Sequence, residues 1–256
     1  MQLEHNIQQP VGERKATPIL FLHGAWHAAW CYDLWMNEFA AHGYEAHSFS
    51  LPAHGQSKSG RSVNLYGLRD YVDALTQIVD SIKPTPYLVA HSLGGYVLQE
   101  YLKTHDLPAA VLLCPLPYFG AVPFYLRYFR KHPVRYLVAI ATLNLGRMVN
   151  TPELAREYFL TEGAEVTPEQ LASRLQNESM RVALRCILPI FNRQSKTPLL
   201  VMAAERDGIF PVSEEKRVAE KYHAELQVIP GQGHNLMVER DWQQVATRIR
   251  SWLESR

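Results

Sequence analysis

The sequence has few cysteines, no long hydrophobic run and almost no net charge. Its 256 residues include three cysteines, Cys31, Cys114 and Cys186. This odd number and uneven spacing exclude a disulfide framework and a zinc site, and they indicate buried thiols in a reducing compartment. The formal net charge of +1 provides no long-range field that would attract nucleic acid, phosphates or acidic lipid. We therefore expect no nucleic-acid partner.

Segments that would direct the chain into a membrane or out of the cell are also lacking. The longest apolar stretch near the middle, residues 136–143, is far shorter than the roughly 20 residues that cross a bilayer, so we expect no integral membrane association. Residues 1–6 show no charged start followed by an apolar core, which disfavours secretion. We expect a cytoplasmic protein, and the sequence leaves its oligomeric state open, a homodimer included.

What the sequence does contain is an alternation of short apolar segments with helical patterns. Strands are predicted at residues 19–22, 44–49, 87–90, 109–114, 197–204 and 224–229. Helices are predicted at residues 31–41, 65–82, 92–103, 212–222 and 241–253. Such alternation is typical of an α/β protein with a parallel sheet, in which all strands end at one edge and form a crevice for a ligand.

The most informative motif is the stretch VAHSLGG at residues 89–95, where an apolar run stops at Ser92. Small neighbours permit the tight strand-to-helix turn that exposes a serine hydroxyl beside a base. The pattern departs from G-x-S-x-G at Ala90, which stands where the first glycine is usual. The alternative interpretation is that Ser92 caps the helix that begins near Leu93, because serine is a favoured N-terminal cap.

Two later strands end in loops that carry residues able to activate a serine. Asp207 follows the strand 197–204, and His234 follows the strand 224–229. An imidazole can take the serine proton near neutral pH, and a carboxylate bonded to its other nitrogen fixes the tautomer. The chain order of serine, acid and histidine is that of doubly wound hydrolases. Glu205 is the alternative acid, but Asp207 is favoured because it lies deeper in the loop.

The loop HGAWH at residues 23–27 is predicted to complete the site. In such enzymes one backbone N–H from this loop and one from the residue after the nucleophile stabilise the oxyanion of the tetrahedral intermediate. We assign these donors to Ala25 and Leu93, with Trp26 as the alternative to Ala25.

These motifs make the chain resemble the α/β-hydrolase superfamily over nearly all of its length, apart from a middle insert. The stretch SLPAHGQS at residues 50–57 resembles the family pattern D-x-x-G-x-G-x-S, with Ser50 and Ala53 where Asp and Gly are common. The stretch at residues 23–31 is similar to a subgroup of plant carboxylesterases, methylesterases and hydroxynitrile lyases. The lysine that hydroxynitrile lyases carry close before the catalytic histidine is missing here. The resemblance implies an α/β-hydrolase fold, with a mostly parallel doubly wound sheet and a helical cap insertion.

The insert is predicted where the alternation of strands and helices stops. We place a helical cap at residues 117–193, between core segments 1–116 and 194–256. The cap opens with an aromatic stretch, and helical patterns follow at residues 135–148, 152–159 and 168–177. The aromatic residues are expected either to form the cap's own core or to line an apolar pocket. Arg127, Arg130 and Lys131 beside them leave a membrane-surface patch as a third interpretation.

Together these features predict a serine esterase with a catalytic triad of Ser92, Asp207 and His234. It would cleave a small to medium apolar carboxylic ester through an acyl-enzyme on Ser92, with a small-molecule substrate and no metal or organic cofactor. The alternatives on the same fold are a cofactor-free dioxygenase, a C–C bond-cleaving enzyme and a ligand-binding protein. Epoxide or haloalkane hydrolysis is disfavoured because the resemblance places an aspartate, not a serine, at the elbow in those enzymes.

Overall fold

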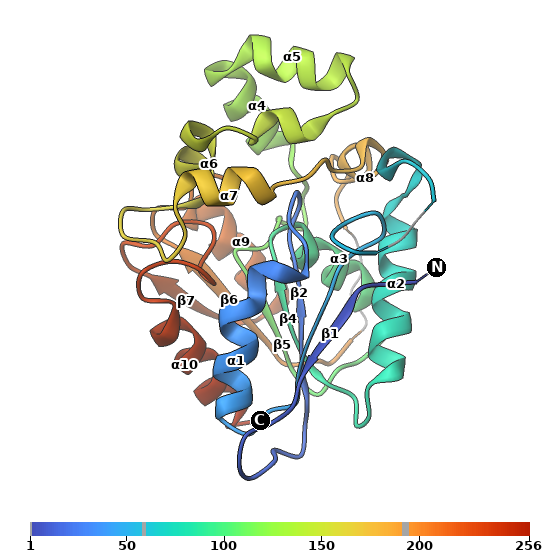
Figure 1. Cartoon of the computed structure of the whole chain (residues 1–256), viewed down its shortest axis with the longest axis vertical. Helices are drawn as coiled ribbons and strands as arrows, with labels where there is room; N and C mark the ends of the chain where they lie inside the picture. The colour runs from blue at the N-terminus through green and yellow to red at the C-terminus, as the bar shows by residue number, and fades with distance from the viewer. Residues whose placement is uncertain (1, 58–59, 191–194) are drawn as a thin grey trace.

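A computed structural model describes residues 2–57, 60–190 and 195–256 of the chain. In this part of the chain, seven strands form one sheet in the order β1-β3-β2-β4-β5-β6-β7 (Figure 1). The strands are β1 (His5–Gln8), β2 (Ile19–Leu22), β3 (Ala46–Phe49), β4 (Tyr87–His91), β5 (Ala110–Leu113), β6 (Leu199–Ala204) and β7 (Glu225–Ile229). β1 runs antiparallel to β3, and the other neighbouring pairs are parallel. The predicted fold class, a mostly parallel α/β sheet, is confirmed.

Helices cover the sheet on both sides (Figure 1). The α-helices of the sheet layer are α1 (Asp33–Ala41), α2 (Leu68–Ser81), α3 (Leu93–Tyr101), α9 (Val212–Tyr222) and α10 (Trp242–Leu253), and the short 3₁₀ helices here are η1 (Ala29–Tyr32) and η2 (Val63–Leu65). The predicted helix 65–82 is therefore two elements, η2 and α2. Figure 1 shows α1 in front of the sheet and α3 and α9 behind it.

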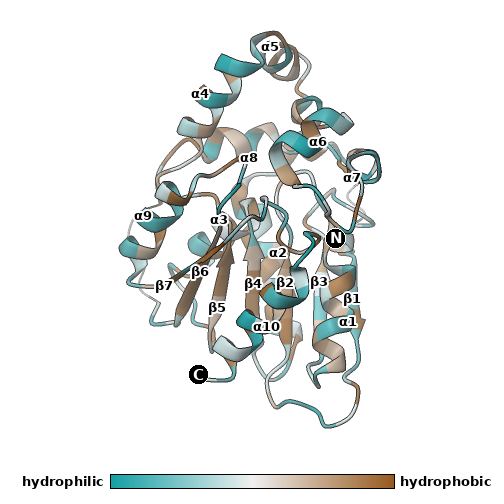
Figure 2. Ribbon diagram, turned by 90° about the vertical axis from the view of Figure 1, so that its left-hand side faces the viewer, coloured by the Kyte–Doolittle hydropathy of each residue, from teal (hydrophilic) through white to brown (hydrophobic). Residues whose placement is uncertain are grey.

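The central strands are apolar because both of their faces are covered. Every residue of β2, β5 and β6 is buried, which is typical of strands that lie between two helical layers. Figure 2 shows these strands in the hydrophobic colour. The edge strand β1, with the sequence HNIQ and a mostly exposed surface, lacks this signal, and the sequence did not predict it.

Five further α-helices lie between β5 and β6 in the chain and stand above the sheet (Figure 1). They are α4 (Val122–Lys131), α5 (Pro133–Ala141), α6 (Pro152–Phe159), α7 (Pro168–Arg174) and α8 (Met180–Arg185), with the 3₁₀ helix η3 (Leu145–Met148) after α5. The prediction of one helix at residues 135–148 is wrong, because Leu143 has a left-handed backbone with φ 51° and separates α5 from η3. The predicted end of the cap, residue 193, lies outside the described residues.

The lengths and hydrophobicities of the helices also bear on membrane association. Among the described residues, no helix is both long and apolar enough to span a bilayer.

Candidate active site

Ser92 occupies a strained turn between β4 and α3. Its backbone has φ 52° and ψ −120°, a left-handed region that a non-glycine residue adopts only at a cost and that is enriched at functional sites. Ser92 stands at the N-terminal cap position of α3, but its side chain makes no capping hydrogen bond. The capping interpretation is therefore wrong, and the hydroxyl makes no hydrogen bond to another described residue.

The glycines around this turn are required by close approach of the backbone. A Cβ on Gly94 would lie 2.4 Å from the carbonyl oxygen of His23, and a Cβ on Gly24 would lie 2.7 Å from the Cβ of Ser92. Contacts this short are not tolerated, so glycine lets the loop at residues 23–27 lie directly against the Ser92 turn. The small residues that the sequence places around Ser92 thus have a steric reason.

Asp207 and His234 come together from the loops after β6 and β7. The Nδ1–H of His234 donates a hydrogen bond of 2.7 Å to Oδ2 of Asp207, and both side chains are buried. The second oxygen, Oδ1, accepts hydrogen bonds from the backbone N–H groups of Ile209 and Phe210. Glu205 instead accepts from the backbone N–H of Gly231. The structure therefore pairs Asp207, and not its alternative, with the histidine.

The second ring nitrogen of His234 is uncommitted. Nε2 is buried and has no hydrogen-bond partner among the described residues. With the proton held on Nδ1 by Asp207, this nitrogen presents a lone pair and can accept a proton. The ring centroids of Phe159 and Phe210 lie 6.0 and 5.8 Å from the ring centroid of His234. These two rings place apolar surface beside the imidazole.

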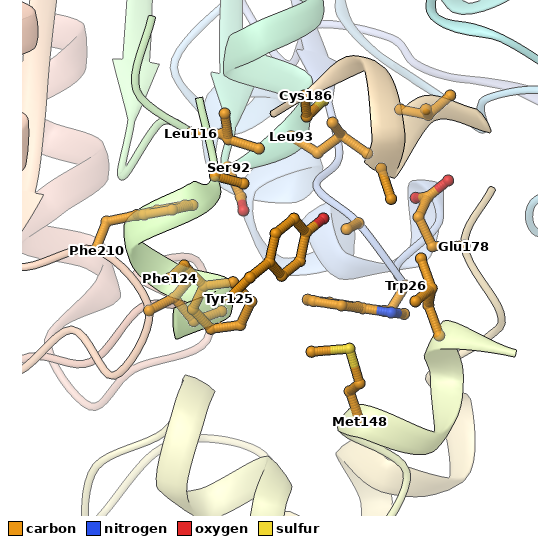
Figure 3. Close-up of a pocket in the computed structure, with 16 residues that line it drawn as sticks. Trp26, Ser92, Leu93, Leu116, Phe124, Tyr125, Met148, Glu178, Cys186 and Phe210 are labelled. Carbon is orange, nitrogen blue, oxygen red and sulfur yellow. The ribbon is translucent and has the colours of Figure 1, made fainter. Parts of the chain in front are cut away.

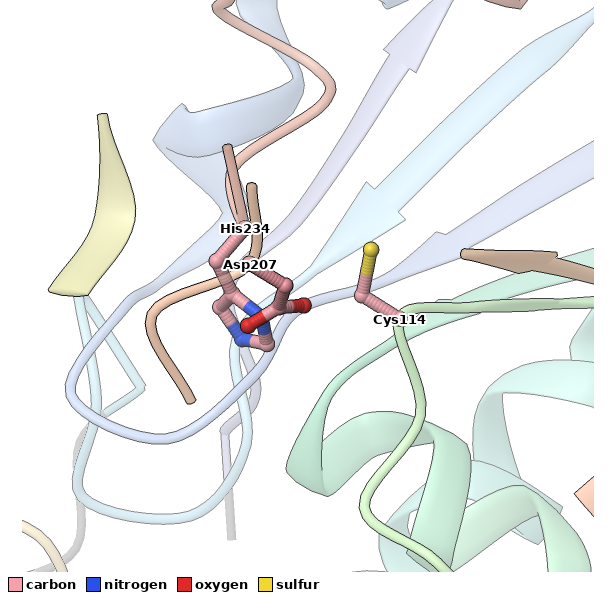
Figure 4. A group of neighbouring side chains, drawn as sticks. All are labelled: Cys114, Asp207 and His234. Atoms are coloured by element: carbon pink, nitrogen blue, oxygen red, sulfur yellow. The ribbon is translucent and has the colours of Figure 1, made fainter. Parts of the chain in front are cut away.

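Cys114 lies beside this pair at the end of β5 (Figure 4). Its sulfur and the nearest ligand atoms of Asp207 and His234 all lie within 4.8 Å of one another. Burial, together with the nearby Asp207 and Glu215 carboxyl groups, raises the pKa of the Cys114 thiol well above its ordinary value. A metal ligand must be a thiolate, and the 2.7 Å contact of Asp207 with His234 is a hydrogen bond. The group therefore fits a hydrogen-bonded pair with a neutral thiol better than a metal site.

Glu215 is a further acid near Asp207 that the sequence did not single out. It is fully buried on α9, and neither carboxyl oxygen has a hydrogen-bond partner among the described residues. Burial raises the pKa of Glu215 well above its ordinary value, and the neighbouring Asp207 and Glu214 add to this shift. The shift favours the neutral form of Glu215, because a second buried carboxylate next to Asp207 would be repelled by it.

An apolar pocket opens over Ser92 (Figure 3). It reaches from the sheet edge to the underside of α4, and Figure 3 shows the rings of Phe124, Tyr125 and Phe210 near Ser92. The other hydrophobic residues that line it are Ala25, Trp26, Leu93, Leu116, Ala121, Leu145, Met148, Val182, Ala183, Cys186 and Ile209. The aromatic residues at the start of the middle segment therefore have two roles. Phe124 and Tyr125 line the pocket, while Tyr128 packs in the interior.

Glu178 is the acid among the residues that line this pocket, and its charge is already balanced. Oε1 accepts hydrogen bonds from the Tyr71 hydroxyl at 2.6 Å and from the Ser179 backbone at 2.6 Å, while Oε2 lies 3.3 Å from Nε2 of His54. Burial disfavours the charged forms of both His54 and Glu178, but the attraction between the two side chains is stronger. The pKa of His54 is therefore raised and the pKa of Glu178 is lowered. This ion pair leaves the pocket suited to an apolar ligand.

The predicted oxyanion donors lie at the same pocket. Ala25, Trp26 and Leu93 all line it together with Ser92. Leu93 is the first residue of α3, where backbone N–H groups have no partner within the helix. Both predicted donor residues therefore lie at the pocket that contains Ser92, and Trp26 remains the alternative to Ala25.

Two buried histidines connect the loops of the site, a role that was not predicted from the sequence. His27 donates from Nδ1 to the Ala25 carbonyl at 2.8 Å, and its Nε2 lies 3.0 Å from the Asn235 side-chain amide. His91 Nε2 lies 3.0 Å from the carbonyl oxygen of His234 and donates to it. His27 thus links the Ala25 loop to the His234 loop, and His91 links the Ser92 turn to the same loop.

These histidines make the protein sensitive to acid. Burial lowers the pKa of His27 to about 4 and lowers the pKa values of His23 and His91 well below 6.5. In unfolded chains these groups titrate near 6.5, so below that pH the unfolded state binds more protons and stability falls as the pH falls. We expect the free energy of unfolding at pH 5 to be lower than at pH 7, by about 2 kcal/mol from His27 alone.

Urea unfolding at pH 5 and pH 7 measures this difference. The variant His27→Gln removes one buried imidazole, so its stability should change less between the two pH values than that of the wild type. His42→Gln, which removes a surface imidazole, is the matched control. Equal wild-type stability at both pH values would contradict the prediction.

Comparison with known proteins agrees with this architecture. The sequence model described as the alpha/beta hydrolase family matches residues 19–248. The chain belongs to the alpha/beta hydrolase family. A search of curated proteins found no match to the sequence.

Solved structures share the fold of this alpha/beta hydrolase over almost its whole length. Est816, described as an N-acyl homoserine lactone degrading enzyme, is 18% identical with a TM-score of 0.73, over 97% of this chain and 96% of its own. Esterase RhEst1 from Rhodococcus sp. ECU1013 is 17% identical with a TM-score of 0.73, over 99% and 94%. A thermophilic esterase from Thermogutta terrifontis is 18% identical with a TM-score of 0.75, over 99% and 93%. Such low identities establish the shared fold and leave the substrate open.

Proposed function

We propose that this alpha/beta hydrolase is a serine esterase that cleaves small to medium apolar carboxylic esters. The observation that carries the proposal is the 2.7 Å pair of Asp207 and His234, held at the same sheet edge as the strained, uncommitted Ser92. The apolar pocket over Ser92 supports an apolar substrate. The similar structures whose names include esterase agree with this reaction class.

In the proposed mechanism, Ser92 Oγ attacks the ester carbonyl while His234 Nε2 takes the hydroxyl proton. The resulting oxyanion is stabilised by the backbone N–H groups of Ala25 and Leu93. The C–O bond to the alcohol then breaks, and His234 returns the proton to the leaving alkoxide. Water attacks the acyl-enzyme with His234 again as the base, which releases the acid and restores Ser92. Asp207 holds the His234 tautomer and stabilises the imidazolium throughout.

The middle segment has a part in this proposal. We place residues 117–193 as a cap that closes the pocket, because Phe124 and Tyr125 of α4 and Val182 of α8 line it opposite Ser92. An apolar cap excludes water from the acyl-enzyme and strengthens the electrostatic contacts around the oxyanion.

Covalent labelling tests the assignment of the nucleophile. A fluorophosphonate should form one adduct on the tryptic peptide that contains Ser92, and the wild-type protein should hydrolyse p-nitrophenyl butyrate. His234→Ala should lose both the adduct and the turnover, because the base that activates the serine is gone. An adduct on Ser92 without turnover of esters, thioesters or lactones would favour a non-hydrolytic role for the fold. Absence of both would overturn the proposal.

A further inference from the structure

The near-neutral charge of the whole chain conceals a strongly basic segment. Residues 107–152 contain no aspartate or glutamate and five basic residues, Arg127, Arg130, Lys131, Arg135 and Arg147. In the structure, Arg127 pairs with Glu214 and Lys131 with Glu157, while no ion pair to another described residue balances the other three. The net charge of the whole chain therefore does not describe the local charge of this part of the molecule.

The helices of this segment present apolar side chains to solvent. On α5, Val134, Leu137 and Val138 are 73%, 58% and 40% exposed, and their spacing places them on one face of the helix. Exposed side chains at similar spacing on α4 are Val122, Leu126 and Phe129. A surface helix ordinarily turns such a stripe toward the core, whereas the stripe of α5 is largely exposed.

The position of these helices makes the exposed stripes accessible to a large flat partner. α4 and α5 contact one another through Phe129 and Tyr136, and Figure 1 shows them at one end of the molecule, with α5 outermost. The exposed basic residues Arg130 and Lys131 lie at the end of α4, next to the start of α5. Apolar and cationic side chains therefore occur together at the tip of the fold.

We propose that the α4–α5 hairpin, residues 122–141, docks on the surface of a membrane that contains anionic lipids. A helix with an apolar face beside basic residues binds in the plane of the interface, and each nearby Lys or Arg adds attraction to anionic headgroups. A second copy of the chain fits this face less well, because a two-fold contact would bring the same basic side chains together.

Docking in this way would place the hydrolase pocket beside the lipid. The inner side of α4 contributes Phe124 and Tyr125 to the pocket over Ser92, while Leu126 and Phe129 of the same helix are exposed. If the proposed esterase activity holds, apolar esters dissolved in the membrane become the natural substrate class. The docking itself does not depend on that activity, so it is tested by binding alone.

Sedimentation with lipid vesicles measures the docking directly. The full chain should bind vesicles of phosphatidylcholine with phosphatidylserine at least about tenfold more tightly than vesicles of phosphatidylcholine alone. High salt should weaken binding to the anionic vesicles, because it screens the attraction. No sedimentation with anionic vesicles would overturn the proposal, and intact Ser92 labelling in the same sample would show that the proposed hydrolase had not failed with it.

Two pairs of variants locate the binding surface. Arg130→Glu with Lys131→Glu should weaken binding by at least about tenfold, whereas the same charge change at Arg69 and Lys216, which are exposed on α2 and α9, should leave it within about twofold. Val134→Ser with Leu137→Ser should also weaken it, and the matched change at the exposed Ile7 and Val11 should not.

These variants also distinguish a membrane from a second copy of the chain as the partner of the α4–α5 hairpin. Wild-type binding retained in both hairpin variants would overturn the proposal. A dimer in light scattering that is lost in the Val134→Ser, Leu137→Ser variant, without vesicle binding by the wild type, would assign the face to a second copy instead. Thermal unfolding of each variant checks that it is folded.

Discussion

Replacing Ser92 by alanine is expected to lower kcat for p-nitrophenyl butyrate by at least about 10⁴-fold. The reason is that the substitution removes the atom that forms the acyl-enzyme, and no neighbouring group supplies another. Cys186 lines the pocket but is buried, and Cys114 is fully buried outside it. Burial raises the pKa of both thiols, so neither can replace the serine as a nucleophile. Turnover measured against the uncatalysed rate checks the result.

The same variant should be almost as stable as the wild type. Alanine keeps the Cβ that the turn already accommodates at φ 52°, and the lost hydroxyl makes no capping hydrogen bond in the folded chain. We expect a change in the free energy of unfolding below about 0.5 kcal/mol. Ser48→Ala is the matched control, because it removes from β3 a buried hydroxyl that has no hydrogen-bond partner among the described residues, and it should leave kcat unchanged. Substantial residual turnover in the Ser92 variant would exclude it as the nucleophile.

The sequence predicted the sheet because its buried strands carry their own signal. Segments such as Ile19–Leu22 and Leu199–Ala204 are continuously apolar, and the structure has strands there. The edge strand β1 is polar and was not predicted, since its pairing with β3 comes from backbone contacts between distant segments. α4 was also missed, because its aromatic residues were interpreted only as cap core or pocket lining, although the stretch Val122–Lys131 is amphipathic at helical spacing.

The candidate site also contains residues whose roles were predicted and residues whose roles were not. Ser92, Asp207 and His234 were predicted because each follows a strand, and strand ends meet at one edge of a parallel sheet. The roles of His27 and His91 could not be predicted, because their partners in the His234 loop are 208 and 143 residues away in the chain. Only the folded backbone brings these loops within hydrogen-bond distance.

The second large effect is expected from Asp207→Asn, which should lower kcat by about 10⁴-fold. The carbonyl oxygen of asparagine can keep the hydrogen bonds that Ile209 and Phe210 donate to Oδ1. Its NH₂ group then faces Nδ1 of His234, where a carboxylate oxygen now accepts. The imidazole must present a lone pair at Nδ1 and carry its proton on Nε2, so it can no longer accept the proton of Ser92.

Glu205→Gln separates this effect from a general loss of negative charge in the loop. Glutamine retains an oxygen that can accept from the Gly231 backbone, as Oε2 of Glu205 does, and we expect kcat within about threefold of the wild type because this bond does not reach the histidine. Steady-state kinetics of both variants distinguish the two carboxylates. A large loss in Glu205→Gln with near-normal turnover in Asp207→Asn would reverse the assignment of the acid. Retention of the Ile209 and Phe210 hydrogen bonds implies little change in KM for Asp207→Asn, so its effect should fall on kcat.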